Sequence, residues 1–361
     1  MERVWGIFVI TLIFTGTCLC QSIRDSTTVS IASQFSYGKI LAHSRSIADL
    51  TDSYIWGWQA DVSRVRYTKA SWNICNCYSE NGISLSYFNF NNPKELGSAM
   101  SLALFAEPQL TLNRLFLSFR AGMGVAYVTR IYHPDANPRN LFFSTPWNGL
   151  LLVQLSARYR LAPQWTLRFG TSYQHISNGG KRQPNKGMNF PLLSLGIDYA
   201  TKHQDLRPRA RHSQSDRALH SYAELSYNTR SLSEMNVASD ERAVVWGLHA
   251  GLYKPIANMH ALGVGLEISH DGLLKELARQ DPDAYDHRVI SALVMHHLLF
   301  GRFDFSPAIG FYIHKQYPEP SRVFQRYAMY YQMFENFRIG FSLKAHLQTA
   351  EQMDVRLGVL F

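Results

Sequence analysis

Three polar residues of the types found in serine esterases lie close together in this sequence, at positions 175, 177 and 189. His175 and Ser177 end one alternating run of residues, and Asn189 begins the next. Successive side chains of a strand point to opposite faces, and all three share the parity of the apolar residues around them. A serine hydroxyl becomes a nucleophile when a neighbouring base takes its proton and a third group fixes the tautomer of that base. We therefore interpret Ser177 as the nucleophile, His175 as the base and Asn189 as the residue that orients the imidazole.

The turn between the two runs is rich in groups that could stabilise a developing oxyanion. Backbone N–H groups of a glycine turn and side-chain amides supply such donors, and the candidates are Asn178, Gly179, Gly180 and Asn185. Two basic residues of the same turn, Lys181 and Arg182, would fit a phosphorylated glycolipid. The alternative is a polar strand end capped by a Gly/Asn/Pro turn, the more frequent origin of a lone His-x-Ser string. That alternative does not explain why three polar groups share the apolar parity.

The whole string resembles the lipid A 3-O-deacylase family of outer-membrane esterases. The matching positions are His175, Ser177, Asn178, Gly180, Gln183, Pro184, Asn185 and Gly187, and the resemblance extends back through Ala121, Gly122, Met123, Gly124 and Val125. It covers about residues 27–200. The resemblance implies an eight-stranded barrel, a Ser/His pair on its outer wall and ester cleavage on lipid A, with Asn185 in the oxyanion hole.

One position departs from that family, which typically has a glutamate where this chain has Asn189. An asparagine carries no charge to stabilise an imidazolium, but it can still hold the ring, as in Cys-His-Asn enzymes. The His-x-Ser-Asn-Gly string with a later asparagine also resembles the outer-membrane phospholipase A family. Two alternatives therefore stay open: a phospholipase, and a non-catalytic barrel that is a pore or a structural protein.

The composition indicates a transmembrane β-barrel. Charged residues make up 17% of the 361 residues and aromatic residues 13%, and no internal apolar run approaches the roughly 18 residues of a membrane-spanning helix. Few charges, many aromatics and alternating faces are typical of barrels, whereas a soluble β-sandwich is the alternative. The net charge of +9 would permit nucleic-acid binding, but membrane-type strands and a signal peptide argue against it.

Alternating segments punctuated by Gly, Asn, Pro and charges predict the strands. Before residue 201 they lie near 27–38, 53–66, 82–90, 97–107, 113–127, 147–160, 164–177 and 189–200. After residue 218 they lie near 219–227, 243–254, 261–269, 288–299, 302–314, 324–334, 337–348 and 352–361, with a short helix expected at 271–279. If both ends of the first unit lie in the periplasm, its seventh strand runs outward. His175 and Ser177 would then lie in the leaflet that holds lipid A.

These patterns divide the chain into four parts. Residues 1–20 read as a secretory signal, with Arg3, an apolar stretch from Val4 to Phe14, and Cys18 and Cys20 before the cleavage site. A deacylase-like unit follows at 21–200, then a polar, basic linker at 201–218 and a second strand unit at 219–361. The second unit is either a degenerate copy without the serine or a case of convergent barrel patterning. The strand that ends at Phe361 resembles an outer-membrane recognition signal and favours one large barrel, whereas the long linker favours two.

The remaining features predict no cofactor and no metal. Cys75 and Cys77 are too few for a zinc site without a nearby pair of histidines. On a regular strand their Cβ atoms would lie too far apart for a relaxed disulfide, although a loop could close one. We interpret them as structural or incidental. The sequence does not indicate an oligomeric state, and the partners it does indicate are lipopolysaccharide and outer-membrane lipids.

Overall fold

The computed structural model is built almost entirely from antiparallel strands. It describes residues 26–180, 182–202, 209–213, 217–232, 241–281, 286–316, 321–346 and 349–361. The predicted signal segment, Lys181 and part of the predicted linker lie outside these residues. No helix in the described ranges combines the length and the apolar character needed to cross a membrane.

The first eight strands form one closed barrel. Each strand pairs with the next, and β1 pairs with β8 to close the sheet. The strands are β1 (Thr27–Lys39), β2 (Tyr54–Arg66), β3 (Tyr78–Asn92), β4 (Gly97–Leu112), β5 (Leu115–Val128), β6 (Trp147–Arg160), β7 (Trp165–Ser177) and β8 (Met188–Ala200). All eight predicted segments are confirmed, because strict alternation over ten or more residues is a strong strand signal.

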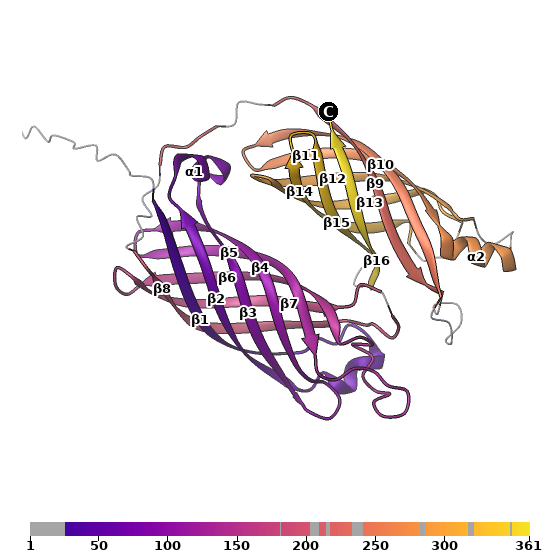
Figure 1. Cartoon of the computed structure of the whole chain (residues 1–361), viewed down its shortest axis with the longest axis horizontal. Coiled ribbons are helices and arrows are strands. Elements are labelled where there is room, and N and C mark those ends of the chain that lie inside the picture. Colours follow the sequence, from indigo (N-terminus) through magenta and orange to yellow (C-terminus); the bar gives the residue numbers. More distant parts are fainter. Residues whose placement is uncertain are drawn as a thin grey trace, which may run out of the picture.

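The last eight strands form a second closed barrel (Figure 1). They are β9 (His220–Ser231), β10 (Arg242–Ala257), β11 (His260–Asp271), β12 (Arg288–Phe300), β13 (Phe303–His314), β14 (Val323–Phe334), β15 (Phe337–His346) and β16 (Thr349–Leu360). Helix α2 (Gly272–Gln280) follows β11, where the sequence predicts a helix. The sequence left one large barrel and two small ones open, and the structure has two, because β16 pairs with β9 and not with the first unit.

The two cysteines form a disulfide between Cys75 and Cys77. Cys75 is the last residue of helix α1 (Lys69–Cys75), and Asn76 adopts a left-handed conformation with φ of 54°. The pair thus lies in the α1–β3 turn and not on a regular strand, so the spacing argument against a bond does not apply. Of the two interpretations that the sequence left open, the disulfide agrees with the structural one.

The two barrels have apolar outer walls and polar interiors, the reverse of a soluble protein. Large side chains stand on the outer walls at 57–64% exposure, among them Leu104, Leu155, Leu193, Leu248 and Leu266. Strand residues of the opposite parity point into the lumen and are buried. This alternation is typical of barrels that face lipid on the outside.

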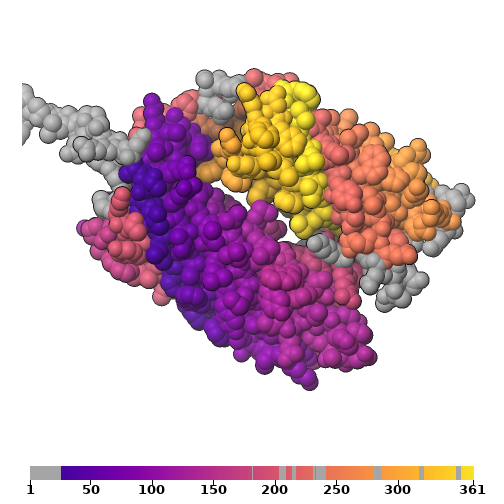
Figure 2. All heavy atoms as spheres, in the orientation of Figure 1, coloured from indigo at the N-terminus to yellow at the C-terminus, as the bar shows by residue number. Residues whose placement is uncertain are grey.

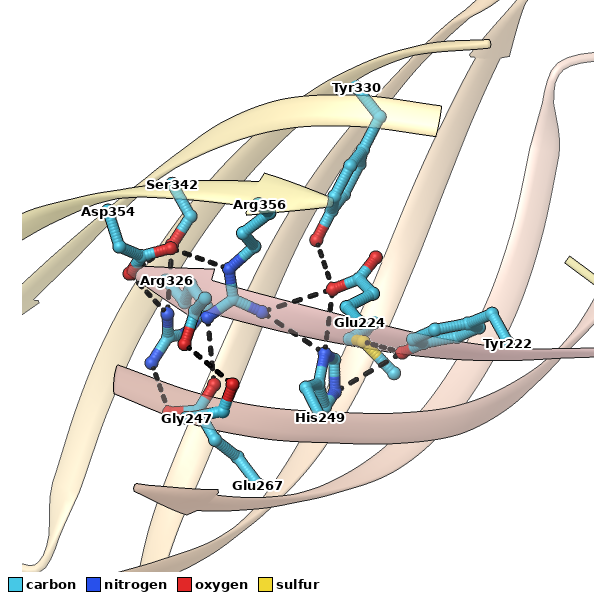
Figure 3. Close-up of polar contacts among 12 residues, drawn as sticks. Tyr222, Glu224, Gly247, His249, Glu267, Arg326, Tyr330, Ser342, Asp354 and Arg356 are labelled. Atoms are coloured by element: carbon cyan, nitrogen blue, oxygen red, sulfur yellow. Dashed lines mark hydrogen bonds and ion pairs between the residues drawn. The ribbon is translucent and has the colours of Figure 1, made fainter. Parts of the chain in front are cut away.

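Networks of ion pairs fill both lumens. In the first barrel they join Arg120, Arg158 and Arg168 to Asp61, Glu80, Glu107 and Asp198. In the second they join Arg326, Arg338 and Arg356 to Glu224, Glu267, Asp304 and Asp354. Figure 3 shows Arg356 between carboxylates from three strands. An eight-stranded barrel is just wide enough for such side chains, so the occupied lumens count against a pore.

Candidate active site

The end of β7 and the start of β8 bring the three predicted site residues together. His175 is the cross-strand partner of Asn189, and Ser177 lies two residues further along β7 on the same face. The His175 Nε2 atom lies 2.9 Å from Ser177 Oγ, and His175 Nδ1 lies 2.6 Å from Asn189 Oδ1. Both distances are within hydrogen-bonding reach, so Ser177, His175 and Asn189 are hydrogen-bonded in the order that the sequence predicts.

His175 and Ser177 belong to the outer wall of the barrel and not to its lumen. They share the parity of the exposed residues Phe169 and Tyr173, while the intervening Ile176 is fully buried. Across the ladder to β6, Leu151 faces His175 and Gly149 faces Ser177. The hydroxyl therefore stands beside apolar side chains that face lipid.

Hydrogen bonds within the turn after β7 give it a defined shape. The Asn178 N–H donates to Asn185 Oδ1 at 3.1 Å, and the Gly180 N–H donates to Asn178 Oδ1 at 3.0 Å. The Asn178 Nδ2 amide donates to Ser144 Oγ at 3.0 Å and to the Arg182 carbonyl at 2.9 Å. Ser144, from the β5–β6 loop, also donates to that carbonyl at 2.7 Å. Asn178 is thus fully engaged in holding the turn.

A hydrophobic cluster at the same end of the barrel supports the turn. The β5–β6 loop contributes Phe142 and Phe143, and the 3₁₀ helix η1 (Arg45–Leu50) contributes Ile47 and Leu50. The loop accepts backbone hydrogen bonds directly from the turn: Gly187 N–H donates to the Phe142 carbonyl at 3.2 Å. Burial of these apolar side chains thus fixes the β5–β6 loop, and the loop holds the turn that carries the polar site.

These contacts separate the predicted oxyanion donors into two groups. The N–H of Gly180 and both polar ends of the Asn178 side chain are used inside the turn. Among the described residues, the Gly179 N–H has no such bond, and Asn185 uses its Oδ1 but keeps its Nδ2 amide as a donor. Gly179 and Gly180 both have positive φ, at 66° and 81°. Arg182 is exposed beside the site, and Lys181 lies outside the described residues.

Two residues that the sequence argument missed contact the site. Ser144 supports the turn, and His43 lies beyond Asn189, with its Nδ1 atom 3.3 Å from Asn189 Nδ2. His43 follows β1, and barrel closure brings β1 beside β8. No local pattern marks either residue. The eight-strand count alone could have pointed to the segment after β1, because closure places it next to the start of β8.

The second barrel touches the turn but does not repeat its chemistry. Met353 of β16 lies against Gly179, where a Cβ atom would come within 2.6 Å of the Met353 sulfur. Figure 2 shows the yellow C-terminal strands against the first barrel. His346, at the position that corresponds to His175, follows a register shift and bonds to Tyr312 Oη at 3.1 Å and Glu351 Oε2 at 3.1 Å. Its imidazole therefore belongs to a part-buried hydrogen-bond network.

Two family models match the chain, one on each barrel. The model described as lipid A 3-O-deacylase matches residues 61–198, and the model described as acyloxyacyl hydrolase, C-terminal domain, matches residues 220–361. The chain belongs to the lipid A 3-O-deacylase family. The range matched by the deacylase model spans positions 175, 177 and 189, and the second match makes the C-terminal barrel part of the family resemblance as well.

A search of curated proteins finds no match to the chain. Among solved structures, Neisserial surface protein A is 12% identical with a TM-score of 0.33, and the alignment covers 48% of this chain and 98% of that protein. A mutant porin of Rh. blastica is 9% identical with a TM-score of 0.21, and the alignment covers 93% of this chain and all of the porin (100%).

Proposed function

We propose that this chain is an outer-membrane serine esterase that removes an ester-linked acyl chain from lipid A. The observation that carries the proposal is the hydrogen-bonded series Ser177–His175–Asn189 on a lipid-facing wall. A hydrolase whose nucleophile faces lipid takes its substrate from the bilayer. Membership of the deacylase family supports the same substrate class.

The reaction follows the acyl-enzyme route of serine hydrolases. Ser177 Oγ attacks the ester carbonyl while His175 Nε2, 2.9 Å away, takes the hydroxyl proton. The tetrahedral intermediate collapses, the C–O bond to the sugar breaks, and His175 returns its proton to the sugar oxygen. Water, deprotonated by the same imidazole, then hydrolyses the Ser177 ester and releases the fatty acid. Asn189 Oδ1 holds the Nδ1–H of His175 through both steps.

We assign the oxyanion hole to the Asn185 Nδ2 amide and the Gly179 N–H. Both lie in the turn directly after Ser177, and the bond from the Asn178 N–H to Asn185 Oδ1 turns the Asn185 amide so that its nitrogen is left to donate. Asn178 and Gly180 take a supporting role, since their donors are used within the turn. One donor of this kind contributes roughly 3–4 kcal/mol to transition-state stabilisation.

The surface around Ser177 suits an acyl ester of a phosphorylated glycolipid. Gly149 leaves open space opposite Ser177, since a Cβ atom there would meet only the Ser177 carbonyl oxygen at 3.5 Å. Trp147 and Leu151 stand on either side at 64% and 41% exposure and would line the path of an acyl chain. Arg182 is exposed at the polar end, where it would meet phosphate.

The direction of the strands supports a site in the outer leaflet. With the N-terminal end of β1 in the periplasm, each odd-numbered strand of an eight-stranded meander runs outward, so β7 ends at the cell surface. The turn from 178 to 187 then lies at the level of the lipid A head group.

Mass spectrometry of lipids incubated with the purified full-length protein tests the proposal. The expected result is a lipid A species that lacks one hydroxyacyl chain, with no product from Ser177→Ala. Production of lysophospholipid from glycerophospholipid, dependent on calcium and abolished by chelation, would instead favour the phospholipase alternative. Equal product from wild type and Ser177→Ala, or no product from either lipid, would overturn the esterase proposal.

A further inference from the structure

His43 is placed to control the catalytic hydrogen bonds from outside the predicted site. The segment after β1 runs beside the start of β8, and the Leu41 N–H donates to the Asn189 carbonyl at 2.8 Å. This pairing sets the half-buried His43 between two groups: its Nδ1 lies 3.3 Å from Asn189 Nδ2, and its Nε2 lies 2.9 Å from the Lys186 carbonyl. His43 therefore extends the hydrogen-bonded series to four residues: Ser177, His175, Asn189 and His43.

With both imidazoles neutral, the donors and acceptors of this series allow one arrangement of protons. A carbonyl oxygen only accepts, so the Nε2 of His43 carries the hydrogen that bonds to Lys186. In a neutral imidazole the Nδ1 of His43 must then accept, and it takes a hydrogen from the Asn189 amide. Asn189 therefore presents its oxygen to His175, whose Nδ1 must donate and whose Nε2 is left to accept from Ser177.

An asparagine at position 189 needs a hydrogen-bond partner that fixes the orientation of its amide, whereas a carboxylate does not. Both oxygens of a carboxylate only accept, so a glutamate fixes the tautomer of the histidine in either orientation. The two ends of an asparagine amide differ, and the reversed amide would donate to His175 Nδ1. That reversal would place the ring hydrogen on Nε2, where it blocks transfer of the Ser177 proton. The orientation of Asn189 therefore decides whether His175 can act as a base.

We propose that His43 is a positioning residue that fixes the orientation of Asn189, and thereby makes an asparagine a competent third member of the site. The inference rests on the proposed esterase function. In the part of the chain that the structure describes, no hydrogen bond joins His43 to Ser177 or His175, so its hydrogen-bonded route to the base runs through Asn189. Its contribution should vanish wherever residue 189 has no orientation to fix.

A double-mutant cycle on the full-length protein separates this role from a general structural one. His43→Leu removes the acceptor, and we expect kcat/KM to fall by roughly 3- to 10-fold, the usual effect of one lost hydrogen bond. His43→Gln retains an acceptor oxygen and should keep most of the activity. In an Asn189→Asp background, which is isosteric and symmetric, His43→Leu should have no effect. Arg45→Ala, an exposed change in the same segment, is the matched control.

Nitrogen NMR of selectively labelled histidine provides a readout that needs no substrate. Wild type should show His175 protonated on Nδ1, and His43→Leu should show a mixture of the two ring tautomers. An unchanged tautomer in His43→Leu, or an equal loss of activity in the Asn and Asp backgrounds, would overturn the inference. Absence of lipid A hydrolysis by wild type would count against the esterase alone, because the NMR result still decides whether His43 sets the tautomer.

Discussion

Gly149 and Ser177 lie directly opposite each other across the β6–β7 ladder, both on the outer wall of the first barrel. Because glycine has no side chain, the nucleophile opens onto free lipid-facing surface. A Cβ atom at position 149 would meet nothing closer than 3.5 Å. A bulky side chain at position 149 would therefore stand directly beside the hydroxyl.

Substitution at Gly149 should separate steric access from catalysis. Gly149→Ala should leave kcat/KM within about twofold of wild type, because surface changes of this size rarely matter. Gly149→Phe should lower kcat/KM by at least about tenfold, because the ring would cover Ser177. Kinetics on a long-chain ester measure both, and an active Phe variant would mean that substrate reaches Ser177 from elsewhere.

Gly187 is expected to be intolerant of even one methyl group. Its φ is 66°, and a Cβ atom there would come 3.0 Å from His175 Cε1 and 3.1 Å from Ser177 Cβ. Gly187→Ala should lower kcat/KM by roughly 10- to 100-fold, since small misplacements of reacting groups have effects of that order. The heat-modifiable gel shift of a folded barrel should persist. Loss of that shift would mean that the substitution acts on folding instead.

Replacing Asn189 by Asp should raise activity. The aspartate is isosteric with the asparagine that lies 2.6 Å from His175 Nδ1, and its charge would stabilise the imidazolium formed during attack. We expect kcat to rise by at least about tenfold, whereas Asn189→Leu should lower it. If Asp and Leu behaved alike, residue 189 would have no part in the reaction.

The lumen network should contribute to stability and leave the chemistry untouched. Glu107 is fully buried and pairs with Arg120 at 2.7 Å and Arg168 at 2.8 Å. Glu107→Gln would remove the carboxylate charge that both guanidinium groups bond to in the lumen, at a cost of roughly 3–5 kcal/mol in the free energy of unfolding. Urea unfolding in detergent measures this, with Glu276→Gln as control, because the partly exposed Glu276 pairs with the exposed Arg279 at the surface of α2. Similar midpoints for the two variants would contradict a stabilising network.

The strands and the central site residues were predictable because both follow from a period of two. Alternation over β5 and β7 separates lipid-facing from lumen-facing residues, and the same parity put His175, Ser177 and Asn189 on one face. That period is identical for one barrel of sixteen strands and two of eight. The pairing of β16 with β9 instead of β1 therefore does not follow from the alternation, and the long linker was the feature that favoured it.

The contacts that were not predictable join residues far apart in the chain. His43 reaches Asn189 only because the sheet closes between β1 and β8. Ser144 reaches Asn178 only because apolar burial of Phe142 and Phe143 draws the β5–β6 loop over the barrel end. Such contacts depend on closure and packing, which a reading of successive residues does not contain.

Covalent trapping of Ser177 tests the central claim most directly. The purified protein in micelles would be treated with a long-chain fluorophosphonate, which reacts only with an activated serine, and the adduct would be located by peptide mass spectrometry. The account predicts one adduct, on Ser177, that is absent in His175→Ala. An unmodified Ser177, or labelling that persists without His175, would contradict an activated nucleophile on the lipid-facing wall.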